Sequence, residues 1–188
     1  MNSRCIMAPL GASHIAVNDR EKDDFYATHP SAIDHLLTVE KFNARILEPA
    51  CGMGHLSKRL IEHGYDVTSY DLRDRGYGET KDFFSIPAWE GDIITNPPYK
   101  HAPEFIRHAL EIVESGAKVA MFLKILFLES KGRQQMFREL PPIRIYVSSS
   151  RIPCALNGVF TGKSSATCYA WYVWEQGYSG LPTIDWIN

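Results

Sequence analysis

The chain has 188 residues, of which 45% are hydrophobic, and this length and composition suit one globular domain with a substantial core. No apolar run approaches the ~18 residues that a membrane span needs, and the polar start does not resemble a secretory signal, so we expect a cytoplasmic protein without a membrane partner. The net charge of −2 argues against a protein that simply coats nucleic acid, and neither the four cysteines nor the seven histidines have zinc-site spacing, so we expect no metal.

Short β-rich runs alternate with helical stretches along most of the chain. Residues 1–22 are aperiodic and predict a flexible N-terminal arm ahead of one domain over 23–188. Helices are expected just after Pro30 and over 55–63, 103–115 and 129–140, and strands over 44–47, 65–72, 92–95, 118–126, 143–148 and 167–175. This alternation predicts an α/β fold with a parallel sheet, helices on both faces, and a ligand site beyond the carboxyl ends of the strands.

A glycine loop, Glu48-Pro49-Ala50-Cys51-Gly52-Met53-Gly54, links the first strand to the next helix. Gly52 and Gly54 let the backbone turn tightly beside a ligand, and the helix that follows offers free N–H groups. At the end of the next strand, the carboxylate of Asp71 can accept both hydroxyls of a ribose. Glu48 suits a cofactor with cationic groups better than one with a pyrophosphate, and Ser57 replaces the third glycine of the NAD fingerprint. The loop therefore predicts a nucleoside-containing cofactor.

The tetrapeptide Asn96-Pro97-Pro98-Tyr99 follows a predicted strand and is the more specific motif. The two prolines fix their own φ angles and bias Asn96 to an extended conformation, which makes a rigid bracket. The amide oxygen of Asn96 and the carbonyl oxygen of Pro97 can then accept hydrogen bonds from one planar NH2 group, while Tyr99 stacks on the ring that carries it. Because two acceptors localise the nitrogen lone pair, this bracket predicts transfer of an activated methyl group to an exocyclic amine.

These motifs resemble those of the S-adenosylmethionine-dependent amino-methyltransferases of the DNA adenine N6 type, and the resemblance covers nearly everything from Asp23 onward. The family's order of segments also matches that of this chain: an upstream segment, here Phe25 to Pro30 with His29 inserted, then the glycine loop and the tetrapeptide. The tail 171–174 resembles the last strand of small phage and prophage members, so the resemblance points to phage or bacterial cells and to DNA restriction and modification.

The resemblance also assigns roles to individual residues. S-adenosylmethionine is the implied cofactor and DNA the implied partner. The implied catalytic residues are Asn96, Pro97, Pro98 and Tyr99. The implied cofactor-binding residues are Tyr26, Thr28, Glu48, Pro49, Ala50, Cys51, Gly52, Gly54, Asp71, Leu72, Asp82, Phe83 and Asn96.

The fold implied by the resemblance is a Rossmann-like class I methyltransferase domain. It has a mostly parallel seven-stranded sheet with helices on both faces and an antiparallel last strand. The family's first and fourth strands are neighbours, which would set Gly52 and Asn96 on opposite lips of one cleft. The residues that remain after Tyr99 are largely consumed by the expected strands and helices, so no separate target-recognition domain is expected within 23–188.

Contacts to DNA are expected from the loop 151–166, between two strands expected to pair antiparallel, and from basic residues near the tetrapeptide. Such contacts to the phosphate backbone would give little or only short sequence specificity. The residues expected to make them are Lys100, Lys124, Lys131, Arg133, Arg151, Asn157, Phe160 and Lys163.

Other functions remain compatible with the sequence. Methylation of adenine or guanine in structured RNA, or of a protein glutamine, uses a similar bracket, although about 45 residues ahead of the glycine loop cannot hold the helical domain usual in glutamine enzymes. Cytosine N4 is a further target. From another class, the chain could be a non-catalytic nucleic-acid-binding module, which would have no need of the bracket. The sequence leaves the oligomeric state open.

Overall fold

The computed structural model describes residues 26–156 and 167–188, so the expected arm over 1–22 and residues 157–166 lie outside the described part of the chain. The strands are β1 (Tyr26–Thr28), β2 (Arg45–Glu48), β3 (Asp66–Asp71), β4 (Glu79–Thr80), β5 (Asp92–Thr95), β6 (Lys118–Lys124), β7 (Arg144–Ser148), β8 (Cys154–Leu156), β9 (Tyr169–Glu175) and β10 (Thr183–Ile187). The helices are α1 (Ser31–Val39), α2 (His55–Glu62), α3 (Ala102–Ile112) and α4 (Lys131–Glu139), with 3₁₀ turns at Phe83–Ser85, Tyr99–His101 and Ile125–Leu128.

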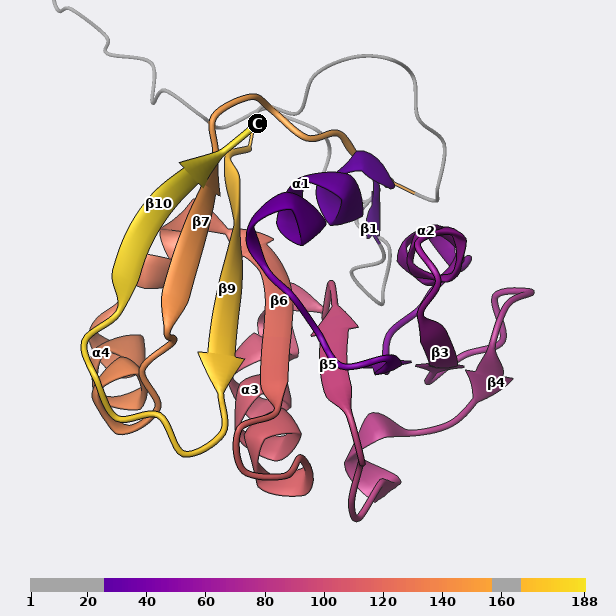
Figure 1. Cartoon of the computed structure of the whole chain (residues 1–188), viewed down its shortest axis with the longest axis horizontal. Coiled ribbons are helices and arrows are strands. Elements are labelled where there is room, and N and C mark those ends of the chain that lie inside the picture. Colours follow the sequence, from indigo (N-terminus) through magenta and orange to yellow (C-terminus); the bar gives the residue numbers. More distant parts are fainter. Residues whose placement is uncertain (1–25, 157–166) are drawn as a thin grey trace, which may run out of the picture.

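The main sheet is mostly parallel, as expected, and has the strand order β10-β7-β9-β6-β5-β2-β3-β4 (Figure 1). Strands β3, β2, β5 and β6 run parallel to one another, whereas β9 is antiparallel to both β6 and β7. The expectation that β2 and β5 are adjacent is confirmed. The chain moves from β2 toward β4 and then returns through β5 toward the other edge, so strand order reverses between β2 and β5. The carboxyl ends of these two strands are therefore the place for a ligand.

The expected antiparallel strand, which holds residues 171–174, is confirmed as β9, but the sheet has more than the expected seven strands. The described residues form eight strands in the main sheet, and the last strand is β10, which pairs parallel with β7 beyond the antiparallel β9. Strand β10 has a weak sequence signal because it is an edge strand with Ile184 and Trp186 more than half exposed. The two-residue strand β4 adds the opposite edge.

A separate two-stranded sheet joins two distant parts of the chain. Strand β1 pairs antiparallel with β8, so that Thr28 lies opposite Cys154. Neither strand was expected, and β8 lies inside the segment expected to be a loop over 151–166. This pairing carries the residues just before α1 across to the carboxyl end of the main sheet.

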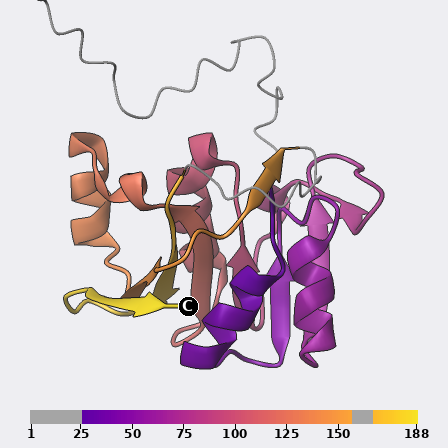
Figure 2. The same ribbon diagram turned by 90° about the horizontal axis from the view of Figure 1, so that it is seen from above.

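Two cores cover the two faces of the main sheet, and Figure 2 shows α1 and α2 on one face and α3 and α4 on the other. Successive side chains of a strand point to opposite faces of the sheet, and β2 contributes to both cores in this way. Ile46 packs on the side of α1 and α2, Leu47 packs on the side of α3, and both are fully buried. Ile33 and Leu36 bury α1 as the sequence predicts. In the described part of the chain no helix is both long and apolar enough to cross a bilayer.

Candidate functional site

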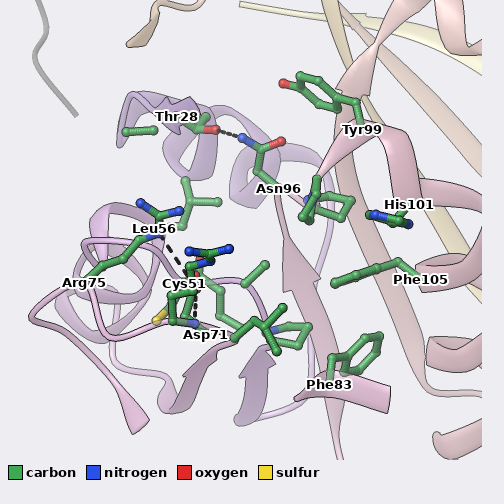
Figure 3. Close-up of a pocket in the computed structure, with 18 of the residues that line it drawn as sticks. Thr28, Cys51, Leu56, Asp71, Arg75, Phe83, Asn96, Tyr99, His101 and Phe105 are labelled. Atoms are coloured by element: carbon green, nitrogen blue, oxygen red, sulfur yellow. Dashed lines mark hydrogen bonds and ion pairs between the residues drawn. The ribbon is translucent and has the colours of Figure 1, made fainter. Parts of the chain in front are cut away.

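A cavity of about 350 Å³ opens where the carboxyl ends of β2, β3 and β5 meet. Its volume falls within the range of small-molecule sites. The cavity brings together most residues that the sequence assigned to the cofactor and to catalysis (Figure 3): Thr28, Glu48, Pro49, Ala50, Cys51, Asp71, Leu72, Asp82, Phe83, Asn96, Pro97, Pro98 and Tyr99. Lys100, assigned to DNA, also lines it.

The glycine loop lies against β3 and turns through two residues that need positive φ. Gly52 has φ of 55° and Gly54 has φ of 78°, a region that L-residues with a side chain rarely adopt. Gly54 is needed for a second reason, since a Cβ there would overlap the ring of Tyr77. A backbone hydrogen bond of 2.8 Å from the Cys51 N–H to the Tyr70 carbonyl ties the loop to β3.

Asp71, at the end of β3, accepts backbone hydrogen bonds on both of its carboxylate oxygens. One carboxylate oxygen accepts a hydrogen bond of 2.8 Å from the Gly52 N–H, and the other accepts one of 3.0 Å from the Arg73 N–H. The Arg75 guanidinium lies 3.8 Å from the same carboxylate, with its side chain 17% exposed (Figure 3). The backbone thus fixes the orientation of a carboxylate that faces the cavity and that carries at least one more lone pair on each oxygen.

Glu48 is the buried carboxyl group of the site, at the last position of β2. It is 2% exposed, and Ser57 of α2 donates to it through its hydroxyl, which in turn accepts a 2.7 Å hydrogen bond from Ser69. Burial is the main cause that raises the pKa of Glu48 to about 8, and the nearby Asp71 carboxylate adds to it. Burial likewise raises the pKa of the Cys51 thiol to about 12, so Cys51 is no nucleophile at neutral pH.

The tetrapeptide forms the opposite wall, directly after β5. The side-chain amide nitrogen of Asn96 donates a 2.8 Å hydrogen bond to the hydroxyl of Thr28, and this bond turns the amide oxygen toward the side on which Tyr99 lies (Figure 3). The Pro98 carbonyl accepts a 2.9 Å hydrogen bond from the His101 N–H, which closes the 3₁₀ turn that carries Tyr99. The ammonium of Lys124 lies 4.7 Å from the centre of the Tyr99 ring.

Aromatic side chains form a third wall. Phe83 is 2% exposed and packs on Phe105 with ring centres 4.8 Å apart, and His108 contacts its carbonyl at 3.0 Å. Asp82 accepts a 3.0 Å hydrogen bond from the Phe84 N–H, so its carboxylate caps the turn that presents Phe83. This wall can take the flat face of a nucleoside base.

Several cavity residues were not predicted. Some stand inside the sequence motifs, beside assigned residues: Ala27, His55, Leu56 and Phe84. The others reach the site from positions with no motif of their own, and only the three-dimensional arrangement of strands and loops reveals them: Arg73, Arg75, His101 and Phe105. Gly52 and Gly54 shape the wall through their backbones without being lining residues themselves. Tyr26 is placed by its backbone in β1.

The residues assigned to DNA contacts fall into four groups. Lys100 and Lys124 lie beside Tyr99, and Lys131 and Arg151 are exposed. Arg133 instead has a structural role, because its guanidinium donates to the backbone carbonyls of Phe127 at 2.7 Å and Glu129 at 2.7 Å. Asn157, Phe160 and Lys163 lie outside the described residues.

The described residues contain no group of three or more His, Cys, Asp or Glu side chains arranged to hold a metal ion. The acidic groups of the cavity, Glu48, Asp71 and Asp82, each accept hydrogen bonds from donors of the chain. What the site offers is a carboxylate facing a pocket, an aromatic wall, and a rigid amide beside a tyrosine.

Structures of known proteins share this fold. A protein of Agrobacterium tumefaciens described as a predicted O-methyltransferase has a TM-score of 0.56 and 16% identity over 79% of this chain and 81% of that one. An S-adenosylmethionine-dependent O-methyltransferase of Thermotoga maritima has a TM-score of 0.52 and 18% identity, over 80% of this chain and 65% of that one. The type IIG restriction endonuclease BpuSI has a TM-score of 0.51 and 14% identity, over 72% of this chain and 23% of that one.

No protein-family model and no curated sequence matches the chain. At these low identities, the structural likeness establishes the fold. It is the Rossmann-like class I methyltransferase fold, as the resemblance of the motifs implied.

Proposed function

We propose that this protein transfers a methyl group from S-adenosylmethionine to N6 of adenine in DNA. One observation carries the proposal: a single cavity has the glycine loop and Asp71 on one wall and the tetrapeptide Asn96 to Tyr99 on the other. A nucleoside cofactor and an exocyclic amine would therefore meet in one place.

The cavity fits the cofactor in three respects. The oriented carboxylate of Asp71 suits the two hydroxyls of a ribose. The aromatic wall of Phe83 and Phe105 suits the adenine of the cofactor. The buried carboxyl of Glu48 suits a ligand with cationic groups. When bound, S-adenosylmethionine supplies a methyl group already activated by its sulfonium.

The residues of the chain orient the target amine and make its nitrogen more nucleophilic. The Asn96 amide oxygen and the Pro97 carbonyl oxygen each accept one hydrogen of the target amine, which concentrates its lone pair on nitrogen. Thr28 keeps the Asn96 amide in the orientation this requires. Because the prolines hold the bracket rigid before the target arrives, little reorganisation is needed during the reaction.

Adenine in DNA is the target best supported by the motif. A base inside a duplex cannot reach this cavity, so it must be flipped out, at a cost of a few kcal/mol. Stacking on Tyr99 returns about 1–3 kcal/mol and so offsets most of that cost. The fold is shared by the restriction endonuclease BpuSI and by O-methyltransferases, so the choice of DNA rests on the motif.

The proposal includes low sequence specificity. Lys100 and Lys124 lie beside Tyr99, and we expect them to contact phosphates next to the flipped base. Phosphate contacts do not read sequence. Sequencing of DNA methylated in vitro tests this part. We expect methylation at many adenine contexts, and a strict site longer than about four base pairs would contradict it.

The target class is tested by transfer of labelled methyl groups to DNA, structured RNA and protein, side by side, with Asn96→Ala as the control. We expect label in DNA alone, lost in the variant. Label in RNA alone, or in protein alone, would assign the reaction to that substrate instead of DNA. No label with any acceptor, despite cofactor binding, would favour a non-catalytic nucleic-acid-binding module.

A further inference from the structure

The loop between β3 and β4, residues 72–78, lies against the glycine loop. The carbonyl oxygen of Tyr77 is 3.5 Å from the thiol of Cys51, which donates to it. The next residue, Gly78, has no room for a side chain, because a Cβ there would lie 2.8 Å from the sulfur of Cys51 and 2.7 Å from the carbonyl oxygen of Ser69. The β3–β4 loop therefore touches both the glycine loop and β3 through its backbone.

The ring of Tyr77 covers Gly54 of the glycine loop. A Cβ on Gly54 would overlap the ring, so the ring lies against the Cα of Gly54. Gly54 is the residue at which the loop turns into α2: its N–H donates a 2.8 Å hydrogen bond to the Cys51 carbonyl, and its carbonyl accepts one of 2.9 Å from the Lys58 N–H. Tyr77 thus packs on the point where the glycine loop ends and the helix begins.

The side chain of Lys58 contacts both this ring and the glycine loop. Its ammonium lies 4.8 Å from the centre of the Tyr77 ring and donates a 3.2 Å hydrogen bond to the Met53 carbonyl. A cation over the face of a tyrosine is attracted by the π electrons of the ring. Lys58 of α2 therefore links the β3–β4 loop to the glycine loop and holds the Tyr77 ring in place.

Tyr77 and Lys58 act on the glycine loop from outside the cavity. Of the residues that the structure describes, Cys51 and His55 on either side of Gly54 line the cavity, whereas Tyr77 and Lys58 do not. Glycines leave a loop free to adopt other backbone conformations. Because Tyr77 packs on the loop before a ligand arrives, less conformational entropy is lost on binding.

We propose that Tyr77 is a positioning residue for cofactor binding and that Lys58 supports it. The Tyr77 ring keeps Gly54 and the rest of the glycine loop in the conformation that receives the cofactor. The tetrapeptide that begins at Asn96 forms the opposite wall of the cavity, so Tyr77 acts on cofactor affinity and not on the methyl-transfer step. This inference rests on the proposed function, because it takes S-adenosylmethionine as the ligand.

The experiment compares wild type with Tyr77→Ala and Tyr77→Phe, by calorimetry with S-adenosylmethionine and by steady-state methylation of DNA. Both variants keep the backbone carbonyl that Cys51 contacts, so the alanine variant removes the ring alone. We expect Tyr77→Ala to raise the Kd and the KM for S-adenosylmethionine about fivefold with kcat unchanged, and Tyr77→Phe to stay within about twofold of wild type. A Kd for Tyr77→Ala equal to that of wild type, or a loss of kcat alone, overturns the inference.

Lys58→Met keeps the test open if Tyr77→Ala does not fold. The matched control is Lys81→Met, because the Lys81 ammonium makes the same kind of contact with a different ring, 4.6 Å from the centre of Tyr70. We expect Lys58→Met to raise the Kd for S-adenosylmethionine about two- to fivefold and Lys81→Met to leave it unchanged. Equal Kd values for the two variants would show that Lys58 has no specific role and would contradict the inference.

Hydrogen exchange of the cofactor-free protein tests the same role without a ligand. The Gly54 N–H, which bonds to the Cys51 carbonyl, should exchange about fivefold faster or more in Tyr77→Ala, with the amides of α3 unchanged. An equal change in both regions, or no change at Gly54, counts against Tyr77. If wild type does not bind S-adenosylmethionine, the proposed function fails, and exchange at Gly54 still decides whether Tyr77 holds the loop.

Discussion

The side-chain amide nitrogen of Asn96 donates a 2.8 Å hydrogen bond to the hydroxyl of Thr28, 68 residues earlier in the chain. Thr28 is 2% exposed and belongs to β1, which β8 holds in place through antiparallel pairing. The segment ahead of α1 therefore fixes which atom of the Asn96 amide faces the cavity. A motif that is local in sequence depends on a partner supplied by the fold.

Thr28→Val should impair methyl transfer while leaving the shape of the site intact. The methyl group that replaces the hydroxyl cannot accept the hydrogen bond, so the Asn96 amide loses its preferred orientation. We expect kcat to fall about tenfold at saturating cofactor and DNA, equivalent to about 1.4 kcal/mol. Thr28→Ser retains the hydroxyl and should stay within about threefold of wild type. Equal activity of the valine variant and wild type would show that this hydrogen bond has no part in the reaction.

Gly54→Ala should weaken cofactor binding because it disturbs the glycine loop. The backbone there has φ of 78°, which costs a side-chain-bearing residue about 1–2 kcal/mol, and the new Cβ would overlap the ring of Tyr77. We expect an increase of at least tenfold in the Kd for S-adenosylmethionine, measured by calorimetry.

Gly64→Ala is the matched control for this substitution. Gly64 has φ of 90° at the end of α2, but a Cβ there meets nothing within 4 Å. It should lose a similar backbone energy of about 1–2 kcal/mol and keep cofactor affinity. Adding Tyr77→Ala to Gly54→Ala should restore part of the affinity. If both glycine variants weaken cofactor binding equally, the contact with Tyr77 is irrelevant.

Arg133 and Lys100 should respond differently to neutralisation. Arg133 donates to carbonyls around the 3₁₀ turn that precedes α4, and its guanidinium lies 4.7 Å from the Phe127 ring centre. Arg133→Gln should therefore lower the unfolding midpoint, with a loss of about 1–3 kcal/mol. Lys100→Gln should leave stability unchanged and reduce the salt dependence of DNA binding by about one unit of slope. The reverse pattern would restore Arg133 as a DNA contact.

The stability of the cofactor-free protein should fall as pH rises, because of Glu48. In the folded protein the pKa of Glu48 is about 8, above its ordinary value. The contribution of Glu48 to the free energy of unfolding is therefore fully present below about pH 4.5 and is lost as the pH rises through 8. Between pH 6 and 9 we expect wild type to lose about 2–3 kcal/mol more than E48Q, a difference of about 5 °C or more in Tm. Parallel melting curves for the two proteins at both pH values would contradict this.

The parts of the fold that the sequence predicts are those with local patterns. Adjacent apolar residues such as Ile46 and Leu47 mark a strand buried on both faces, and the glycine loop and tetrapeptide stand at strand ends, where a parallel sheet gathers its ligands. For that reason the α/β class and a ligand site at the strand ends follow from local patterns, whereas the adjacency of β2 and β5 and most of the residue roles in the cavity wall come from the resemblance of the motifs to a methyltransferase family.

The unpredicted parts depend on contacts between distant residues. Strand β1 forms because Tyr26 to Thr28 pairs with Cys154 to Leu156. A strand of three residues is too short for its periodicity to be recognised in the sequence. Arg75 enters the cavity because its loop returns from β3 to the carboxylate of Asp71. Arg133 looks like a surface cation until the carbonyls around it are placed. In each case the partner, rather than the residue, sets the role.

The central claim is that the bracket at Asn96 activates an adenine amine. Mass spectrometry of nucleosides from DNA treated with the enzyme and S-adenosylmethionine, for wild type and Asn96→Ala, tests it most directly. We predict N6-methyladenine as the methylated nucleoside for wild type and a loss of at least a hundredfold for the variant, with cofactor binding retained. Methylation at another base, or an Asn96→Ala variant that still produces N6-methyladenine at the wild-type rate, would contradict it.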